Sequence, residues 1–204
     1  MITSKGTLAG ARKRNKLPPS FCNSVSSQHC NIDHLSHTSR LFKSFHKCFF
    51  IMHLNIRSLQ KNLQNLKDLL CDMDMSPDLI ALSETWHNSS SFFIPILPNY
   101  DFISSSFSCN KAGGVAIFLK RSYSYHVRHD LKLGADMCED LWLEVAGING
   151  RSAVVGVIYR HPGCNILNFQ KHFEELTFNL NKSSKPVYIA GDFNIITFFS
   201  RSKF

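Results

Sequence analysis

The segment Val187-Tyr188-Ile189-Ala190-Gly191-Asp192-Phe193-Asn194 joins an apolar run to a glycine and two polar side chains. The apolar run predicts a buried strand, and Asp192 and Asn194 come directly after it. Gly191 allows the backbone to turn tightly before them, because glycine has no Cβ atom. Residues two apart in an extended segment point to the same side, so we expect Asp192 and Asn194 to share one face.

Three other apolar runs end in polar side chains in the same way. The residues at these ends are Asn55, Glu84 and Tyr159. A sheet fixes the side chains at its strand ends in position and leaves them open to solvent, which is why ligand and catalytic groups gather there. If these strands point the same way, all five polar side chains converge at one end of the sheet.

The chemistry of this set suits a hard cation. It contains the carboxylates of Glu84 and Asp192 and the carboxamides of Asn55 and Asn194, with no thiol. Mg²⁺, or Mn²⁺ as an alternative, takes such oxygen ligands and keeps water and substrate phosphate in its other positions. A phosphate ester is therefore the expected substrate, with one carboxylate available to activate the attacking water. Taken singly, these residues could be turn, cap or strand-edge residues, and it is their conjunction that favours a site.

Seven apolar runs predict strands, and two helical patterns interrupt them. The predicted strands cover residues 48–54, 79–82, 100–103, 115–119, 141–145, 153–159 and 187–190. Helices are expected over residues 59–73 and 165–179, where large apolar side chains recur on one face. Residues 100–159 hold strands without a helix, so we expect a mixed or antiparallel sheet in a layered α/β (α+β) fold.

Length and charge bound the domain organisation. A chain of 204 residues, 44% of them hydrophobic, suits one domain rather than two. Residues 1–44 are polar and without periodicity, which predicts a disordered basic N-terminal extension before a domain over residues 47–204. The net charge of +8 belongs to the front, because residues 1–54 hold eight Lys/Arg and one acid, against fifteen and fourteen in residues 55–204. Such an extension is either a solvated tail or a non-specific ligand of phosphate backbones.

The cysteines and the apolar runs indicate the cellular compartment in which the protein is expected. The seven cysteines are widely spaced and form no CxxC pair, so neither a zinc site nor a disulfide framework is predicted, and a reducing, intracellular setting is expected. The run at residues 48–54 is too short to cross a bilayer, and the basic N-terminus has no apolar block of the signal-peptide kind. We therefore expect a protein that is not secreted, with no membrane partner and no obligate protein partner.

These motifs resemble those of the endonuclease/exonuclease/phosphatase superfamily, and most closely its apurinic-endonuclease-like branch found in non-LTR retrotransposons. The matching segments, in order over residues 49–194, are His53-Leu54-Asn55-Ile56-Arg57-Ser58-Leu59, Leu79-Ile80-Ala81-Leu82-Ser83-Glu84-Thr85-Trp86, Gly113-Gly114-Val115-Ala116-Ile117, Tyr159-Arg160-His161-Pro162 and Gly191-Asp192-Phe193-Asn194. The Thr85-Trp86 pair after Glu84 is typical of the retroelement enzymes and favours that branch.

The resemblance implies a four-layer α/β sandwich, with two sheets face to face and helices outside. It also implies Mg²⁺-dependent hydrolysis of a nucleic-acid phosphodiester, with DNA as the expected partner and the nucleus as the expected location. By role, the implied residues are Glu84 and Asn55 at the metal, Tyr159, Asn194 and Arg160 at the substrate, and Asp192, Asn194 and Tyr159 in catalysis.

The chain also departs from the family pattern. The family places a further Asp, and then a His within a Ser-Asp-His pattern, beyond several more strands, and this sequence ends at Phe204 without them. An incomplete sandwich is expected to expose apolar surface and to be of low stability. The alternative hypothesis is therefore a truncated, non-catalytic retroelement fragment whose basic extension binds nucleic acid. A phosphoinositide or sphingolipid phosphate substrate is a third interpretation, which the Glu84-Thr85-Trp86 stretch argues against by resemblance.

Overall fold

The structure is a computed structural model that describes residues 49–87, 92–105, 113–134, 136–146 and 152–195. The predicted extension over residues 1–44 lies outside the described residues. The elements of the described part are β1 (Ile51–Asn55), α2 (Leu59–Asp72), β2 (Leu79–Ser83), β3 (Tyr100–Ser104), β4 (Val115–Lys120), β5 (Tyr125–Val127), the short 3₁₀ helix η1 (His129–Leu131), β6 (Glu139–Ala146), β7 (Ser152–Tyr159), α3 (Ile166–Asn181) and β8 (Val187–Asp192).

The strands form two mixed sheets of four strands each. Sheet A has the order β1-β2-β4-β3 and sheet B the order β5-β6-β7-β8. One pair in each sheet is parallel and is connected by a helix, with α2 between β1 and β2 and α3 between β7 and β8. The remaining pairs are antiparallel. The predicted mixed α/β class is therefore confirmed.

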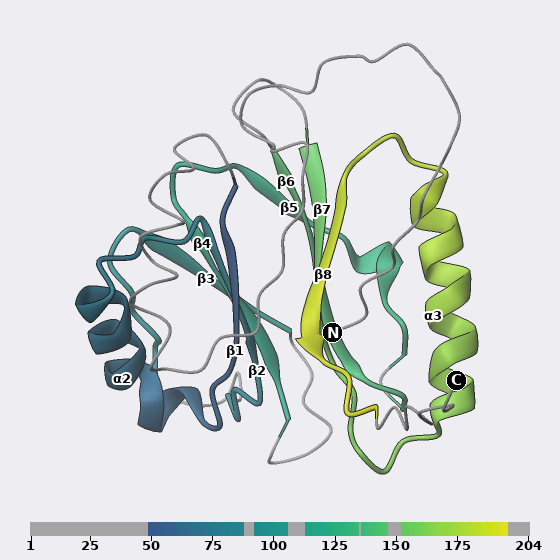
Figure 1. The fold of residues 1–204 in the computed structure, drawn as a ribbon, viewed down its shortest axis with the longest axis horizontal. Helices are drawn as coiled ribbons and strands as arrows, with labels where there is room; N and C mark the ends of the chain where they lie inside the picture. The colour runs from purple at the N-terminus through teal and green to yellow at the C-terminus, as the bar shows by residue number, and fades with distance from the viewer. Residues whose placement is uncertain (1–48, 88–91, 106–112, 135, 147–151, 196–204) are drawn as a thin grey trace, which may run out of the picture.

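The two sheets face each other, and the helices cover their outer faces (Figure 1). The central cluster takes apolar side chains from both sheets, including Leu79 and Ile117 of sheet A and Leu143 and Val157 of sheet B. A second cluster packs the leucines of α2 on sheet A, and a third packs α3 on sheet B. Each sheet thus packs apolar side chains on both of its faces, which confirms the four-layer sandwich.

The predicted strands and helices are all present, with bounds displaced by up to three residues. The expected face of α2 is buried at Leu59, Leu63, Leu66 and Leu70. Helix α3 begins after Asn165, whose side chain accepts hydrogen bonds from two backbone N–H groups of the first turn. Strand β5 and η1 were not predicted, because β5 is three residues long and largely exposed, so it carries no buried alternation.

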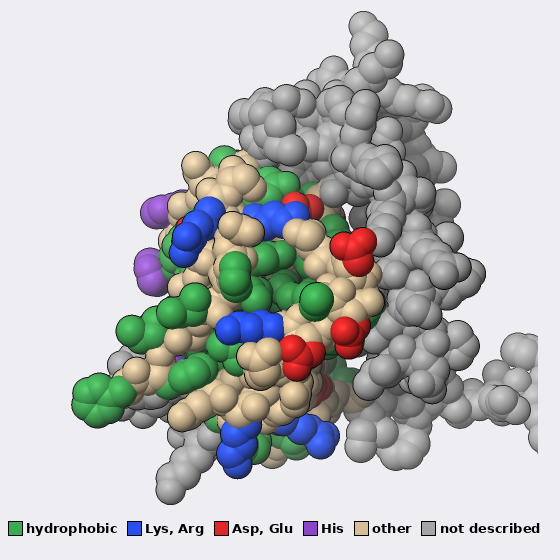
Figure 2. Space-filling model, turned by 90° about the vertical axis from the view of Figure 1, so that its left-hand side faces the viewer, with side chains coloured by type: hydrophobic (Ala, Val, Ile, Leu, Met, Phe, Trp, Pro, Cys, Tyr) green, Lys and Arg blue, Asp and Glu red, His purple; other side chains and the backbone are tan. Residues whose placement is uncertain are grey.

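The surface on the α2 side mixes charges of both signs. Figure 2 shows Lys and Arg side chains interspersed with Asp and Glu around an area of hydrophobic side chains on this face. Large apolar side chains are also exposed between β2 and β3, at Phe92, Ile94 and Ile96. No described helix is both long and apolar enough to cross a membrane.

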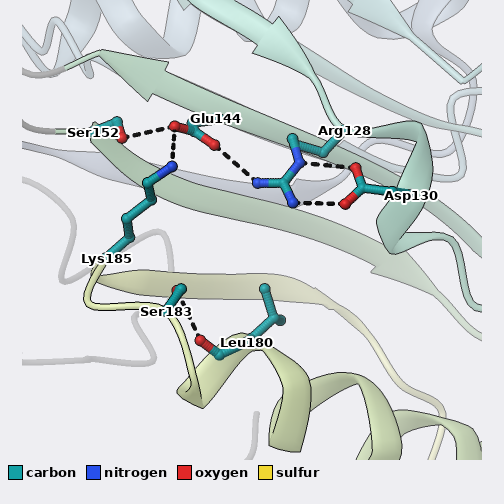
Figure 3. Close-up of polar contacts among 7 residues, drawn as sticks. All are labelled: Arg128, Asp130, Glu144, Ser152, Leu180, Ser183 and Lys185. Carbon is teal, nitrogen blue, oxygen red and sulfur yellow. Dashed lines mark hydrogen bonds and ion pairs between the residues drawn. The ribbon is translucent and has the colours of Figure 1, made fainter.

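A polar network on sheet B centres on Glu144 of β6 (Figure 3). Its carboxylate accepts hydrogen bonds from Arg128 Nη1 at 2.8 Å, from Ser152 Oγ at 2.8 Å and from Lys185 Nζ. Arg128 also donates twice to Asp130, at 2.8 and 2.6 Å. The bonds from Lys185 and Ser152 are the main causes that lower the pKa of Glu144, and the bond from Arg128 lowers the pKa of Asp130 to about 2.

This network makes stability depend on pH. A carboxyl group whose folded pKa is depressed stabilises the fold above its unfolded pKa, here 4.5 for Glu144, and loses that contribution as the pH falls through the folded pKa. We expect Glu144→Gln to lower the free energy of unfolding by about 1–2 kcal/mol at neutral pH. The difference from wild type should shrink in acid, as measured by urea unfolding over a pH series. Glu175→Gln, on the exposed face of α3, is the control, and a Glu144 effect that is constant with pH would contradict the prediction.

The contact between β6 and β7 leaves no room for a side chain at Gly156. A Cβ atom there would overlap the ring of Trp142, which is 1% exposed and is fixed by a 2.8 Å hydrogen bond from its Nε1 to Asp140 Oδ2. We expect Gly156→Ala to lower the free energy of unfolding by about 1–3 kcal/mol, measured by urea denaturation. Gly163→Ala, where a Cβ would meet no atom within 4 Å, is the matched control; equal effects of both substitutions would overturn this account.

Candidate active site

Three of the predicted polar residues meet where β1, β2 and β8 end. Asn55 is the last residue of β1, Glu84 follows β2, and Asp192 is the last residue of β8. Nδ2 of Asn55 donates to Glu84 Oε1 at 2.8 Å and to Asp192 Oδ2 at 3.1 Å. Glu84 follows a strand of sheet A and Asp192 belongs to sheet B, so a single amide group links carboxylates from the two sheets.

Tyr159 lies beside both carboxylates. It is the last residue of β7, is paired with Asp192 of β8 and is 5% exposed. Burial raises the pKa of its phenol, and the negative charges of Glu84 and Asp192 and a hydrogen bond with Glu84 raise it further. The phenol is therefore protonated at neutral pH, and the structure brings four of the five predicted strand-end residues into one neighbourhood.

Asn194 is placed differently from the expectation. Its φ of 47° takes the backbone out of the extended conformation, so the rule that residues two apart share a face does not hold for Asp192 and Asn194. The backbone N–H of Asn194 donates to Asp192 Oδ1 at 3.2 Å, and its Nδ2 donates to the Arg160 carbonyl at 2.8 Å. The Asn194 side chain is thus bonded to the end of β7.

Gly191 serves close packing rather than the turn that was expected. It lies within β8, paired with Ile158 of β7. A Cβ atom at this position would overlap the Ile158 carbonyl group, so only glycine allows β8 to approach β7 this closely. This close approach sets the position of Asp192, the next residue.

Arg160 is buried, at 3% exposed, and its guanidinium is used within the protein. It donates to the carbonyls of Phe193 at 2.7 Å, Asn194 at 2.5 Å, Cys164 at 2.7 Å and His161 at 3.2 Å. These bonds tie the segment after β8 to the segment after β7. Arg160 was expected from the sequence to contact the substrate, and these internal hydrogen bonds differ from that expectation. Nothing in the Tyr159-Arg160-His161-Pro162 motif indicates that Arg160 is buried.

The carboxylates of Glu84 and Asp192 have no cationic partner within the part of the chain that the structure describes. Neither Glu84 nor Asp192 forms an ion pair with a Lys or Arg among the described residues. His53, which sequence reasoning did not single out, lies nearby with Nε2 3.2 Å from Ser83 Oγ. Burial lowers the pKa of His53 to about 4, although Asp192 acts in the opposite direction, so this side chain is neutral at neutral pH. Within the described ranges, neither His53 nor a Lys or Arg ion pair therefore brings positive charge to these two carboxylates.

The donor set fits a hard cation better than zinc. Within the described ranges, no group of three or more His, Cys, Asp and Glu side chains is arranged to hold a metal ion. Mg²⁺ needs less from the protein, because one or two carboxylates, water and substrate phosphates commonly complete its octahedral shell. Glu84 and Asp192, two carboxylates joined through the Asn55 amide, meet that requirement.

Backbone strain gathers around this site. Among the described residues, seven non-glycine residues have positive φ, and five of them flank the site: Arg57, Ser58, Glu84, Trp86 and Asn194. Backbone hydrogen bonds hold two of these conformations, from Ser58 N to Glu84 O at 2.9 Å and from Trp86 N to Gly113 O at 2.8 Å. Such strain persists only where the surroundings determine the geometry, and it is commonly found at functional sites.

Two mixed sheets packed face to face, helices outside them and polar groups at the strand ends together define a four-layer α/β sandwich with a strand-end site. A family model described as the Endonuclease/Exonuclease/phosphatase family matches residues 52–203. The chain belongs to the endonuclease/exonuclease/phosphatase family.

Solved structures share this fold. The endonuclease domain of TRAS1, a telomere-specific non-LTR retrotransposon, matches with a TM-score of 0.54 and 9% identity, over 73% of this chain and 60% of that one. TDP2 from Caenorhabditis elegans matches with a TM-score of 0.52 and 16% identity, over 72% and 47%. Truncated Caenorhabditis elegans TDP2 gives 0.51 and 17%, over 72% and 62%. The chain thus spans less than two thirds of each structure. A comparison with curated proteins found no match.

The buried position of Arg160 predicts a structural cost for its removal. Arg160→Met would remove the guanidinium bonds to the carbonyls of Phe193, Asn194 and Cys164, so we expect the free energy of unfolding to fall by about 3 kcal/mol or more in urea denaturation. Arg121→Met is the matched control, because the Arg121 side chain is 67% exposed and pairs with Asp101 only at the surface; it should cost no more than about 1 kcal/mol. Equal losses of unfolding free energy in the two variants would contradict a structural role for the Arg160 hydrogen bonds.

Proposed function

We propose that this chain carries the metal and phosphate site of a Mg²⁺-dependent phosphodiester hydrolase of the retroelement endonuclease type. The observation that carries the proposal is the Asn55 amide, which holds the Glu84 and Asp192 carboxylates together across the two sheets. Two carboxylates at such a site, without a cationic partner among the described residues, suit a divalent cation and a phosphate ester. Membership of the family supports the same chemistry.

The proposed metal ligand is Glu84, supported by Asn55. Mg²⁺, or Mn²⁺ in its place, would supply charge neutralisation at the phosphoryl oxygens. Asn55 donates to both carboxylates, so it fixes their orientation and limits the rearrangement needed on binding. Neutral His53 adds no positive charge that would compete with a cation.

Asp192 is proposed to activate the attacking water. Its two oxygens accept hydrogen bonds from Asn55 Nδ2 and from the Asn194 backbone, so the carboxylate is held in one orientation. Tyr159 has a raised pKa and stays protonated, which leaves its hydroxyl able to donate to a phosphoryl oxygen. Asn194 is proposed to help stabilise the transition state, while Arg160 holds the backbone of this segment in place.

DNA is the proposed substrate, and the nucleus the proposed location. The TRAS1 structure is described as the endonuclease domain of a retrotransposon, and its fold is shared by this chain. That retrotransposon is described as telomere-specific, and telomeres are chromosomal DNA. Parallel assays on plasmid DNA and on structured RNA distinguish the two substrates, and DNA is expected to be cut faster.

A nicking assay on supercoiled plasmid tests the catalytic proposal. Wild-type protein should nick in Mg²⁺ and stop in EDTA, and Asp192→Asn should slow nicking by about 10²-fold or more. Asp101→Asn is the control, because this carboxylate is a surface residue of β3 paired with Arg121. Nicking by the Asp192 variant at the wild-type rate would refute the mechanism.

Metal binding has a readout that needs no turnover. Mg²⁺ that binds the folded protein raises the melting temperature, because binding stabilises the fold by an amount that grows with the logarithm of the ratio of Mg²⁺ concentration to Kd. The rise seen in wild type should be lost in Glu84→Gln and kept in Asp101→Asn.

The alternative function is nucleic-acid binding without hydrolysis, favoured by the surplus of seven positive charges in residues 1–54. It requires that deletion of residues 1–44 abolishes binding and its salt dependence. Nicking by the full chain that depends on Asp192 decides against it.

A further inference from the structure

Glu139 is a buried carboxylate that the proposed chemistry does not use. It is the first residue of β6, is 4% exposed and is paired with Tyr159 of β7. One of its oxygens accepts a hydrogen bond from the backbone N–H of Gly114, directly before β4 of sheet A. The other lies 3.1 Å from His161 Nε2. A buried carboxylate is costly unless it is hydrogen-bonded, so both contacts are needed for Glu139 to remain there.

His161 connects this carboxylate to the candidate site. Its side chain is 13% exposed, and its ring packs edge-on against the ring of Tyr159, with the centroids 4.9 Å apart and the planes at 86°. Tyr159 in turn lies close enough to Glu84 for that carboxylate to raise the pKa of its phenol, after the larger effect of burial. Gly114, Glu139, His161 and Tyr159 are thus linked in a series that ends beside Glu84.

The contact between Glu139 and His161 leaves no room for a side chain at Gly113. A Cβ atom on Gly113 would overlap the Glu139 carboxylate and lie 3.0 Å from His161 Cε1. The Gly113 carbonyl also accepts from Trp86 N, and the Gly114 carbonyl from Thr85 N, so this corner is bonded to the segment that carries Glu84. Glu139 thus reaches the site from two sides, through the Tyr159 ring and through the backbone next to Glu84.

We propose that Glu139 and His161 are positioning residues for Tyr159: Glu139 orients the His161 ring, and the ring holds the Tyr159 phenol beside Glu84. This inference rests on the proposed function, in which Tyr159 contacts the phosphate. Orientation of an imidazole by a carboxylate is a common device, because the bond at one ring nitrogen fixes the plane of the ring. A displacement of about 1 Å at a reacting group can cost about 10²-fold in rate, so a loosened Tyr159 has a measurable effect.

Two substitutions of His161 separate its two contacts. His161→Phe keeps a ring edge against Tyr159 but removes the donor to Glu139, and His161→Asn keeps a donor but removes the ring. With Glu139→Gln as the third variant, we expect each to lower the turnover number for plasmid nicking by about 10- to 100-fold, with a smaller effect on KM. His172→Asn, on the exposed face of α3, is the control and should leave the rate unchanged.

A double-mutant cycle shows whether His161 acts through Tyr159. In a Tyr159→Phe background, which lacks the phenolic hydroxyl, His161→Asn should have no further effect on rate. Losses that multiply would overturn the proposal, because they would mean that His161 acts on the site by another route or only on stability.

A spectroscopic readout keeps this test independent of turnover. The chain has five tyrosines, and Tyr159→Phe assigns the Tyr159 signal in protein labelled with ¹³C at the tyrosine rings. The Tyr159 signal should shift or broaden in all three variants, while that of exposed Tyr125 stays in place. If wild type does not nick DNA, the proposed function fails, but the Tyr159 signal still tests the positioning role of Glu139 and His161. An unchanged Tyr159 signal in all three variants overturns that positioning role.

Discussion

The face-to-face packing of the two sheets is the constraint on which the site depends. Glu84 follows a strand of sheet A and Asp192 ends a strand of sheet B, so they meet only if the sheets pack in one relative position. Apolar packing alone is non-directional and does not choose between nearby offsets. The polar bonds at the rim, from Gly114 to Glu139 and from Asn55 to Asp192, are directional and select one arrangement of the sheets.

The carboxylates at this rim differ in how their charge is compensated. Glu139 is buried between the sheets with hydrogen-bond partners from Gly114 and His161, so its contacts are complete. Glu84 and Asp192 share the Asn55 amide and have no ion pair with Lys or Arg among the described residues. Complete burial of the Glu84 and Asp192 carboxylates would cost desolvation free energy. Their partly exposed positions at the strand ends avoid that cost. Burial thus distinguishes Glu139 from Glu84 and Asp192, which lie partly exposed at the same rim.

Sequence periodicity predicted the layered fold because each element alternates or repeats its apolar side chains at the spacing that burial requires. The leucines of α2 and the buried runs of β2, β4 and β7 are examples. It missed β5, whose three residues are mostly exposed. For the site, the strand-end rule predicted that Asn55, Glu84, Tyr159 and Asp192 lie near one another, since each ends or directly follows a strand whose direction the sheet fixes. It failed at Asn194, where a left-handed φ breaks the alternation on which the rule depends.

Arg160 and His161 show why the remaining assignments required coordinates. Both follow the same strand and both carry chemistry that can bind phosphate, yet their roles depend on which atoms face them. The Arg160 guanidinium meets four carbonyls of the two segments that follow β7 and β8, and His161 meets Glu139, a residue 22 positions away. No local pattern encodes these long-range partners. Burial together with hydrogen-bond partners therefore decides whether a side chain beside a strand end stays available to a ligand or is used within the protein.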